Sequence, residues 1–89
     1  MAGGGGAMTS AFADDLIAFL KARISERVGL TAAIEEDADL FELGLDSIDA
    51  VEITGEIEEG WGVKLDPEFL FEHRTIARLV EGVGLLLPR

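Results

Sequence analysis

The chain has 89 residues, with 18 acidic and 7 basic side chains and a net charge of −11. A chain of this length forms one domain with a thin core and is too small to enclose a deep substrate pocket of its own. Such an acidic surface repels nucleic-acid phosphates and anionic membranes and attracts proteins that present Arg and Lys. Hydrophobic residues make up 48% of the chain, which excludes a disordered acidic segment. The composition therefore favours a small binding or carrier module over a stand-alone enzyme.

The sequence lacks the features of disulfide-bonded, membrane-spanning and secreted proteins. There is no Cys, so the chain has neither a disulfide framework nor a thiolate metal site. No apolar run approaches the ~20 residues needed to span a bilayer, and the N-terminus lacks the layout of a signal peptide. We therefore expect a cytoplasmic monomer that binds neither nucleic acid nor membranes.

The first residues read MAGGGGA. Consecutive glycines disfavour regular structure, so residues 1–9 are predicted to be a flexible Gly-rich tail. The tail is compatible with an origin in an expression vector and a native start at Met8. The carrier or binding domain is then expected over residues 10–89.

Apolar residues recur at three- and four-residue steps from Phe12 to Val28, the pattern of an amphipathic helix. Thr9 and Ser10 are suitable N-caps, and Gly29 is a suitable stop. We predict a helix over 11–28. A long connection follows up to residue 46, in which Gly44 is expected to supply a positive φ.

A second helix is predicted over 47–59, and its residues divide into two faces at 100° steps. The core face holds Ala50, Ile53, Thr54 and Ile57. The opposite face is predicted to hold Asp49, Glu52, Glu56 and Glu59, called here the acidic ridge. Ile48, Val51 and Gly55 flank the ridge.

The remaining pattern predicts a short helix and a final long one. Asp66 and Pro67 are expected to open the short helix, which contains Phe69, and Thr75 is expected to cap the last helix. The expected fold is all-α, a four-helix bundle of three long helices and one short helix. The predicted core rests on Phe12, Leu16, Leu20, Ile53, Ile57, Leu79 and Val83.

The segment from Leu40 to Ile48, LFELGLDSI, is the most specific feature of the chain. It resembles the phosphopantetheine attachment motif of acyl carrier proteins, in which an apolar-Gly-apolar lead precedes Asp-Ser and an apolar residue that opens a helix. The resemblance covers about residues 12–87. The run FLFEHRTI from Phe69 also resembles the family, although polyketide and nonribosomal carriers often have proline where this chain has Arg74.

The resemblance implies a non-catalytic carrier that is itself the substrate of a phosphopantetheinyl transferase. Its cofactor would be 4′-phosphopantetheine from coenzyme A, attached to Ser47 beside Asp46, Leu45 and Gly44. The arm would carry acyl, polyketide or aminoacyl thioesters. Loading enzymes, synthases and downstream transferases with basic surfaces would dock on the second helix, through Ile48, Asp49, Val51, Glu52, Glu56 and Glu59.

The residues themselves agree with this interpretation. A tethered arm needs a hydroxyl at a fixed, exposed place, and the first residue of a helix after a glycine-containing loop is such a place. A phosphodiester there would lie near free backbone N–H groups and the positive helix end. Simple capping by Ser47 is an alternative, but Asp46 is an equally good cap. A catalytic serine would need a base, and the single histidine, His73, lies far along the chain.

The acidic ridge also has an alternative interpretation, an ordinary solvated face. Like charges at these spacings destabilise a helix, and no Lys or Arg is expected to relieve them, which suggests that partners supply the cations. An unmodified acidic interaction domain that binds a basic partner is the competing function, and replacement of Ser47 separates it from the carrier function.

The acidic run 35–39 lacks the spacing of a calcium loop, so no metal site is expected. Thr54 and Gly55 depart from the bulkier residues that fatty acid carriers tend to have at these positions. Together with the segment His73-Arg74-Thr75, the resemblance therefore favours a carrier of secondary metabolism.

Overall fold

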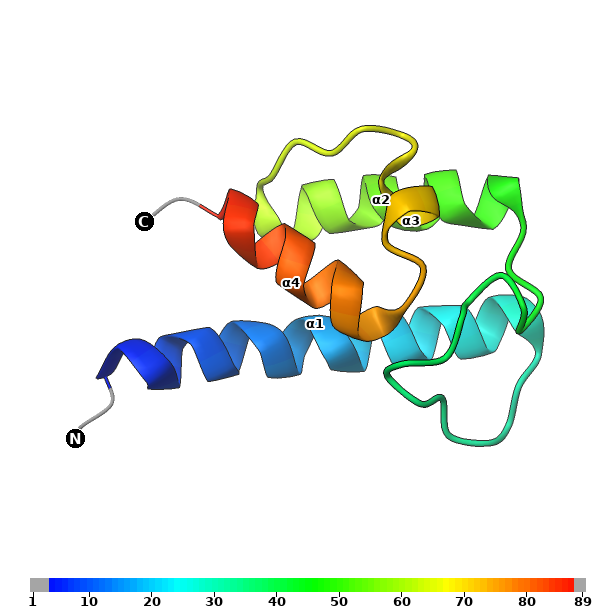
Figure 1. The fold of residues 1–89 in the computed structure, drawn as a ribbon, viewed down its shortest axis with the longest axis horizontal. Coiled ribbons are helices and arrows are strands. Elements are labelled where there is room, and N and C mark those ends of the chain that lie inside the picture. Colours follow the sequence, from blue (N-terminus) through cyan, green and yellow to red (C-terminus); the bar gives the residue numbers. More distant parts are fainter. Residues whose placement is uncertain (1–3, 88–89) are drawn as a thin grey trace.

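The computed structural model describes residues 4–87, and the side chains of residues 11–87. Over these residues the regular secondary structure is entirely helical, which confirms the expected all-α class. The helices are α1 (Gly4–Val28), α2 (Ser47–Trp61), α3 (Phe69–Glu72) and α4 (Ile76–Leu86). The predicted order of three long helices and one short one is therefore correct (Figure 1).

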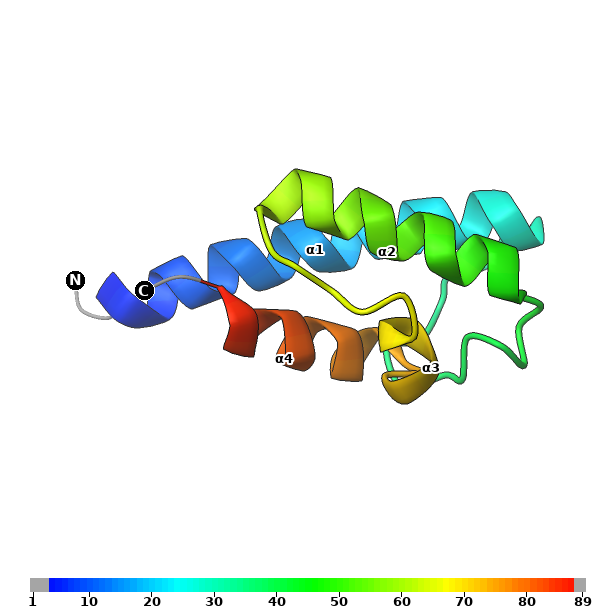
Figure 2. The ribbon, with the colours of Figure 1, turned by 90° about the horizontal axis from the view of Figure 1, so that it is seen from above.

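The start of α1 differs from the expectation. The helix begins at Gly4, not at Ala11, so the glycine run from residue 4 is helical and only residues 1–3 of the predicted tail lie outside the described residues. Glycine is a poor helix former, but adding a residue to an existing helix gains a hydrogen bond, whereas starting a helix is costly. The segment 11–28 can thus extend backwards through glycines that would not start a helix alone. The first turns of α1 project past α2 and α4 in both views (Figures 1 and 2).

Two further boundaries differ from the sequence prediction. Helix α2 continues through Gly60 to Trp61, and the left-handed Gly62 ends it at φ 67°. Asp66 and Pro67 form a turn before α3 and do not cap it; the Asp66 side chain accepts a bond from the Glu68 N–H, and Glu68 is the N-cap. Thr75 does cap α4, since its hydroxyl oxygen accepts from the Arg78 N–H.

Helices α1 and α2 run alongside each other in opposite directions, α4 packs against α1, and α3 contacts α2 (Figure 2). Between them lies a single apolar core. All the predicted core residues are fully buried except Phe12, which is half-buried and packs against the edge of the core beside Gly84. The predicted core face of α2 is also confirmed, since Ala50, Ile53, Thr54 and Ile57 are its buried residues.

The connection between α1 and α2 is fixed to the bundle at several points. Ile34, Leu40 and Leu45 are buried in the core. The backbone of the loop is also paired with the α3–α4 connection and with the first turn of α4. Leu40 N–H donates to the Arg74 carbonyl at 2.8 Å, and Ala77 N–H donates to the Glu36 carbonyl at 2.9 Å. The loop that leads to Ser47 is therefore an ordered part of the fold.

Candidate functional site

Ser47 is the first residue of α2, as predicted, and its side chain is exposed. The Asp46 carboxylate caps the helix by accepting from the Asp49 N–H at 2.8 Å. Asp49 returns the contact, since its carboxylate accepts from the Asp46 N–H at 3.3 Å. This reciprocal pair is a capping box, and it leaves the neighbouring serine out of the cap. Within residues 11–87, the Ser47 hydroxyl has no hydrogen-bond partner and is free for chemistry.

The backbone at the start of α2 offers donors beside that hydroxyl. The Asp49 and Ala50 N–H groups are used by the side chain and carbonyl of Asp46. The N–H groups of Ser47 and Ile48 belong to the first turn and have no intrahelical acceptor. Because the N-terminus of a helix carries partial positive charge, a phosphate ester on Ser47 would be stabilised there.

The two residues before Asp46 set the direction of the chain. Leu45 is buried, which anchors the segment in the core. Gly44 has φ 117°, the positive value expected from the sequence. A side chain at this position would meet ordinary contact distances from Val28, so backbone conformation and not space is what requires glycine.

A second set of contacts holds the middle of the loop. Arg74 donates to both oxygens of Asp39, at 2.8 and 3.3 Å, and its guanidinium lies 4.7 Å from the centre of the Phe41 ring. Phe41 in turn stacks on Phe71 of α3 at 5.0 Å. The hydrogen bond from Arg74 lowers the pKa of Asp39 below its ordinary value. Arg74 thus tethers the loop to the connection between α3 and α4.

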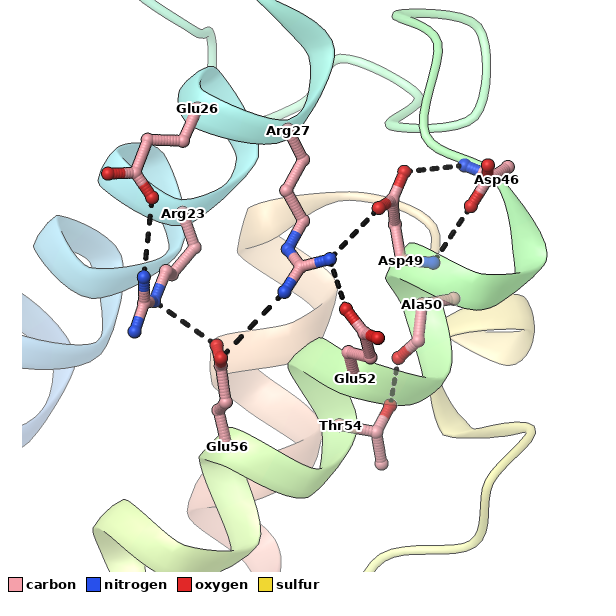
Figure 3. Close-up of polar contacts among 9 residues, drawn as sticks. All are labelled: Arg23, Glu26, Arg27, Asp46, Asp49, Ala50, Glu52, Thr54 and Glu56. Atoms are coloured by element: carbon pink, nitrogen blue, oxygen red, sulfur yellow. Dashed lines mark hydrogen bonds and ion pairs between the residues drawn. The ribbon is translucent and has the colours of Figure 1, made fainter.

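The acidic ridge is not the uncompensated row that the sequence suggested (Figure 3). Arg27 of α1 lies 3.0 Å from an Asp49 oxygen and 3.9 Å from a Glu56 oxygen, and it also bonds Glu52. Arg23 lies 3.2 Å from the other Glu56 oxygen. That oxygen is closed to solvent, and its contact with Arg23 is an ion pair without the geometry of a hydrogen bond. The prediction that no cation relieves the ridge is wrong, because it considered α2 alone and the cations come from the adjacent helix.

These ion pairs change which ridge residues are accessible. Only 17% of the Asp49 side chain and 30% of the Glu56 side chain are exposed, whereas Glu52 is 51% exposed and Glu59 is exposed. Asp49 and Glu56 therefore lie at the α1–α2 boundary, and the prediction that they stand on an exposed face is wrong. The flanking residues Ile48 and Val51 are 68% and 49% exposed, so the apolar margin is accessible.

The charges at this boundary stabilise each other. Hydrogen bonds to Asp49 and then to Glu52 raise the pKa of Arg27. Partial desolvation opposes ionisation of Asp49, but hydrogen bonds from Arg27 and from the Asp46 backbone outweigh it and lower the pKa of that carboxyl. Asp49 is therefore ionised at neutral pH and links α1 to the residue before Ser47.

The sequence predicts partner binding for Asp49, but it does not predict the capping box or the contacts that Arg23 and Arg27 make with α2. The sequence does contain a signal: two arginines four residues apart lie near the end of α1, and two carboxylates seven residues apart, Asp49 and Glu56, lie in the first and middle turns of α2. In antiparallel neighbours joined by one loop, these ends meet.

The geometry is that of a small helical domain that presents an unpaired serine hydroxyl at the start of a helix. The model of the family described as "Phosphopantetheine attachment site" matches residues 18–83. The chain therefore belongs to this family, that of the acyl carrier proteins.

Solved and curated proteins agree with this membership. BlmI, a type-II acyl carrier protein from Streptomyces verticillus involved in bleomycin biosynthesis, is 27% identical with a TM-score of 0.73, and the match covers 96% of each chain. The polyketide synthase ThaQ of Burkholderia thailandensis is 40% identical over 72% of this chain, and the erythronolide synthase EryA3 of Saccharopolyspora erythraea is 29% identical over 79%. The chain spans only 3% and 2% of the length of these two synthases.

The cofactor of the family is covalently attached 4′-phosphopantetheine. The described residues fit such a group at the start of α2. Ser47 offers an exposed, unbonded hydroxyl, and free N–H groups lie beside the position of the ester phosphate. When bound, the arm supplies the thiol that this Cys-free chain lacks.

Proposed function

We propose that Ser47 carries the phosphopantetheine arm and that the protein presents thioester-bound intermediates to separate enzymes without catalysing a reaction itself. The observation that carries this proposal is the exposed Ser47 hydroxyl, left unpaired because Asp46 and Asp49 complete the cap. In the attachment reaction, the Ser47 oxygen would lose its proton and form a phosphodiester, and the nucleotide half of coenzyme A would leave.

The competing hydroxyls are less suited to modification. Thr54 is buried, and its hydroxyl donates to the Ala50 carbonyl at 2.8 Å. Ser25 lies inside α1 and is partly covered. Neither stands at the start of a helix, where an incoming phosphate would meet free N–H groups.

The test is intact mass after incubation with a phosphopantetheinyl transferase and coenzyme A, followed by peptide mapping. We expect one added phosphopantetheine, on the peptide that contains Ser47, and no addition to Ser47→Ala. An arm mapped to another residue would refute the assignment. Unchanged mass of the wild type with several active transferases would instead favour the unmodified interaction domain.

We further propose that the cargo belongs to secondary metabolism, as a polyketide or nonribosomal intermediate, and that the protein acts in the cytoplasm. The support is that the similar proteins are polyketide synthases and a carrier involved in bleomycin biosynthesis. In the part of the chain that the structure describes, no helix is long and apolar enough to cross a bilayer. Competition among acyl and aminoacyl loading enzymes for the arm-bearing protein would identify the cargo class.

Partner enzymes are proposed to dock on the accessible side of α2. That surface combines the apolar Ile48 and Val51 with the carboxylates of Glu52 and Glu59. It suits a partner that places Arg or Lys beside apolar side chains, because opposite charges raise the association rate and apolar contacts hold the complex. Compared with the sequence prediction, Asp49 and Glu56 contribute less, since α1 holds them.

A further inference from the structure

Arg27 is the most connected charged residue of the described chain. From the last turn of α1 it contacts carboxylates on three successive turns of α2: Asp49, Glu52 and Glu56 (Figure 3). Its side chain is 24% exposed, so it lies at the edge of the α1–α2 boundary and not beneath it. One cation of the chain therefore occupies the position where a partner's cation would approach the ridge.

Glu52 is where the internal and external interactions overlap. Its carboxylate accepts from Arg27 through Oε1, yet its side chain is 51% exposed and shares the outer side of α2 with Ile48 and Val51. A guanidinium from a partner binds a carboxylate best through both oxygens. A partner that binds Glu52 in that way shares Oε1 with Arg27 and therefore competes with it.

We propose that Arg27 is a specificity-determining residue, an internal counter-ion that competes with the partner's cation for Glu52 and so weakens docking on α2. This inference rests on the proposed docking surface of the carrier. It also distinguishes two ridge residues. Glu59 has no salt bridge among the described residues and is available to a partner, whereas Glu52 is fully available only when its contact with Arg27 breaks.

The experiment compares Arg27→Gln with Arg23→Gln. Each removes one positive charge, but Arg23 contacts Glu26 and Glu56 and not Glu52, so it controls for net charge. The assay is the rate of loading by a phosphopantetheinyl transferase at low and high salt, below saturation, with folding checked by circular dichroism. Because half-exposed ion pairs contribute little, we expect Arg27→Gln to load about two- to fivefold faster than Arg23→Gln at low salt. High salt should abolish the difference.

Equal rates for the two variants at low salt would overturn the proposal, since only net charge would then matter. A folded Arg27→Gln that loads more slowly than wild type would also overturn it, because Arg27 would then order the site and not compete for it. In both cases a wild type that is modified on Ser47 leaves the proposed function intact; a wild type that is never modified refutes the function itself.

A second comparison needs no change at Arg27. Glu52→Gln and Glu59→Gln both remove an exposed carboxylate from α2. Since Arg27 already neutralises Glu52 in part, Glu59→Gln should slow loading more at low salt than Glu52→Gln does. Equal losses, or a larger loss for Glu52→Gln, would contradict the competition.

Discussion

Two glycines inside helices should respond in opposite ways to the same substitution. Gly55 lies in the interior of α2, and an added Cβ would meet no atom within 4 Å. Gly82 lies in the interior of α4, where an added Cβ would lie 2.8 Å from His73 Nε2 and 2.9 Å from Phe69 Cζ. Because Ala is favoured over Gly by about 1 kcal/mol in a helix, substitution by Ala at either position gains the same free energy from helix propensity.

Only the Gly82 position has an opposing cost. The His73 ring cannot move freely, since its Nδ1 lies 2.9 Å from the Phe69 carbonyl oxygen and its ring stacks on Phe69 with centroids 4.1 Å apart. Overpacking of this kind costs about 1–3 kcal/mol. We therefore expect Gly55→Ala to raise the free energy of unfolding by about 1 kcal/mol, and Gly82→Ala to leave it unchanged or lower it by up to about 2 kcal/mol.

Thermal unfolding followed by circular dichroism measures both effects. In a domain of this size, 1 kcal/mol corresponds to about 4–8 °C in melting temperature. Equal shifts in the same direction would refute the steric account of the α3–α4 contact. Loading of Gly55→Ala by a transferase adds a functional comparison, since no described residue fills the space beside Gly55: a more stable but slower variant would show that a partner uses this space.

Other changes test the cap, the core and the ion pairs. Ser47→Ala should abolish loading and change stability by well under 1 kcal/mol, because Asp46 and not the serine caps α2; chemical denaturation checks the second point. Ile57→Ala should lower the free energy of unfolding by about 2–5 kcal/mol, since this side chain is fully buried, and an unchanged melting temperature would mean that the faces of α2 are reversed. The lowered pKa of Asp49 contributes stability that is present above its ordinary value of 3.8 and is lost as pH falls through the folded value, so Asp49→Asn should lower stability at pH 7 and flatten the acid limb of a pH–stability curve. Arg74→Met should remove the stabilising contact between Arg74 and Asp39. Because the Leu40 amide donates to the carbonyl of residue 74, the expected result is faster hydrogen exchange at that amide.

The parts of this protein that follow from periodicity could be predicted from the sequence. The buried face of α2 follows from its 3.6-residue repeat, and the helix start at Ser47 follows from the preceding Asp and the glycine before it. The end of α2 does not follow from periodicity, because Gly60 and Gly62 are both plausible stops and only the left-handed φ of Gly62 selects one.

The contacts between helices were beyond the sequence argument. The 100° spacing of residues along α2 predicts that Asp49 and Glu56 lie opposite the core, but a helix in a bundle has neighbours on its sides as well as beneath it. Whether a carboxylate at such a lateral position faces water or an arginine depends on the crossing of α1 and α2. That crossing is set by core packing, which a single helix's pattern does not contain.

The pairing of the α1–α2 loop with the α3–α4 connection has a consequence for how the protein opens. The bonds from the Leu40 and Ala77 amides, the Asp39–Arg74 contact and the Phe41–Phe71 stack join segments distant in the sequence. Helix α3 has only the four residues Phe69–Glu72, so it contributes few internal hydrogen bonds. We expect this region to exchange its amide protons as one cooperative unit, at a lower free energy than the α1–α2–α4 core. The segment leading to Ser47 would then loosen on its own while the three long helices stay packed.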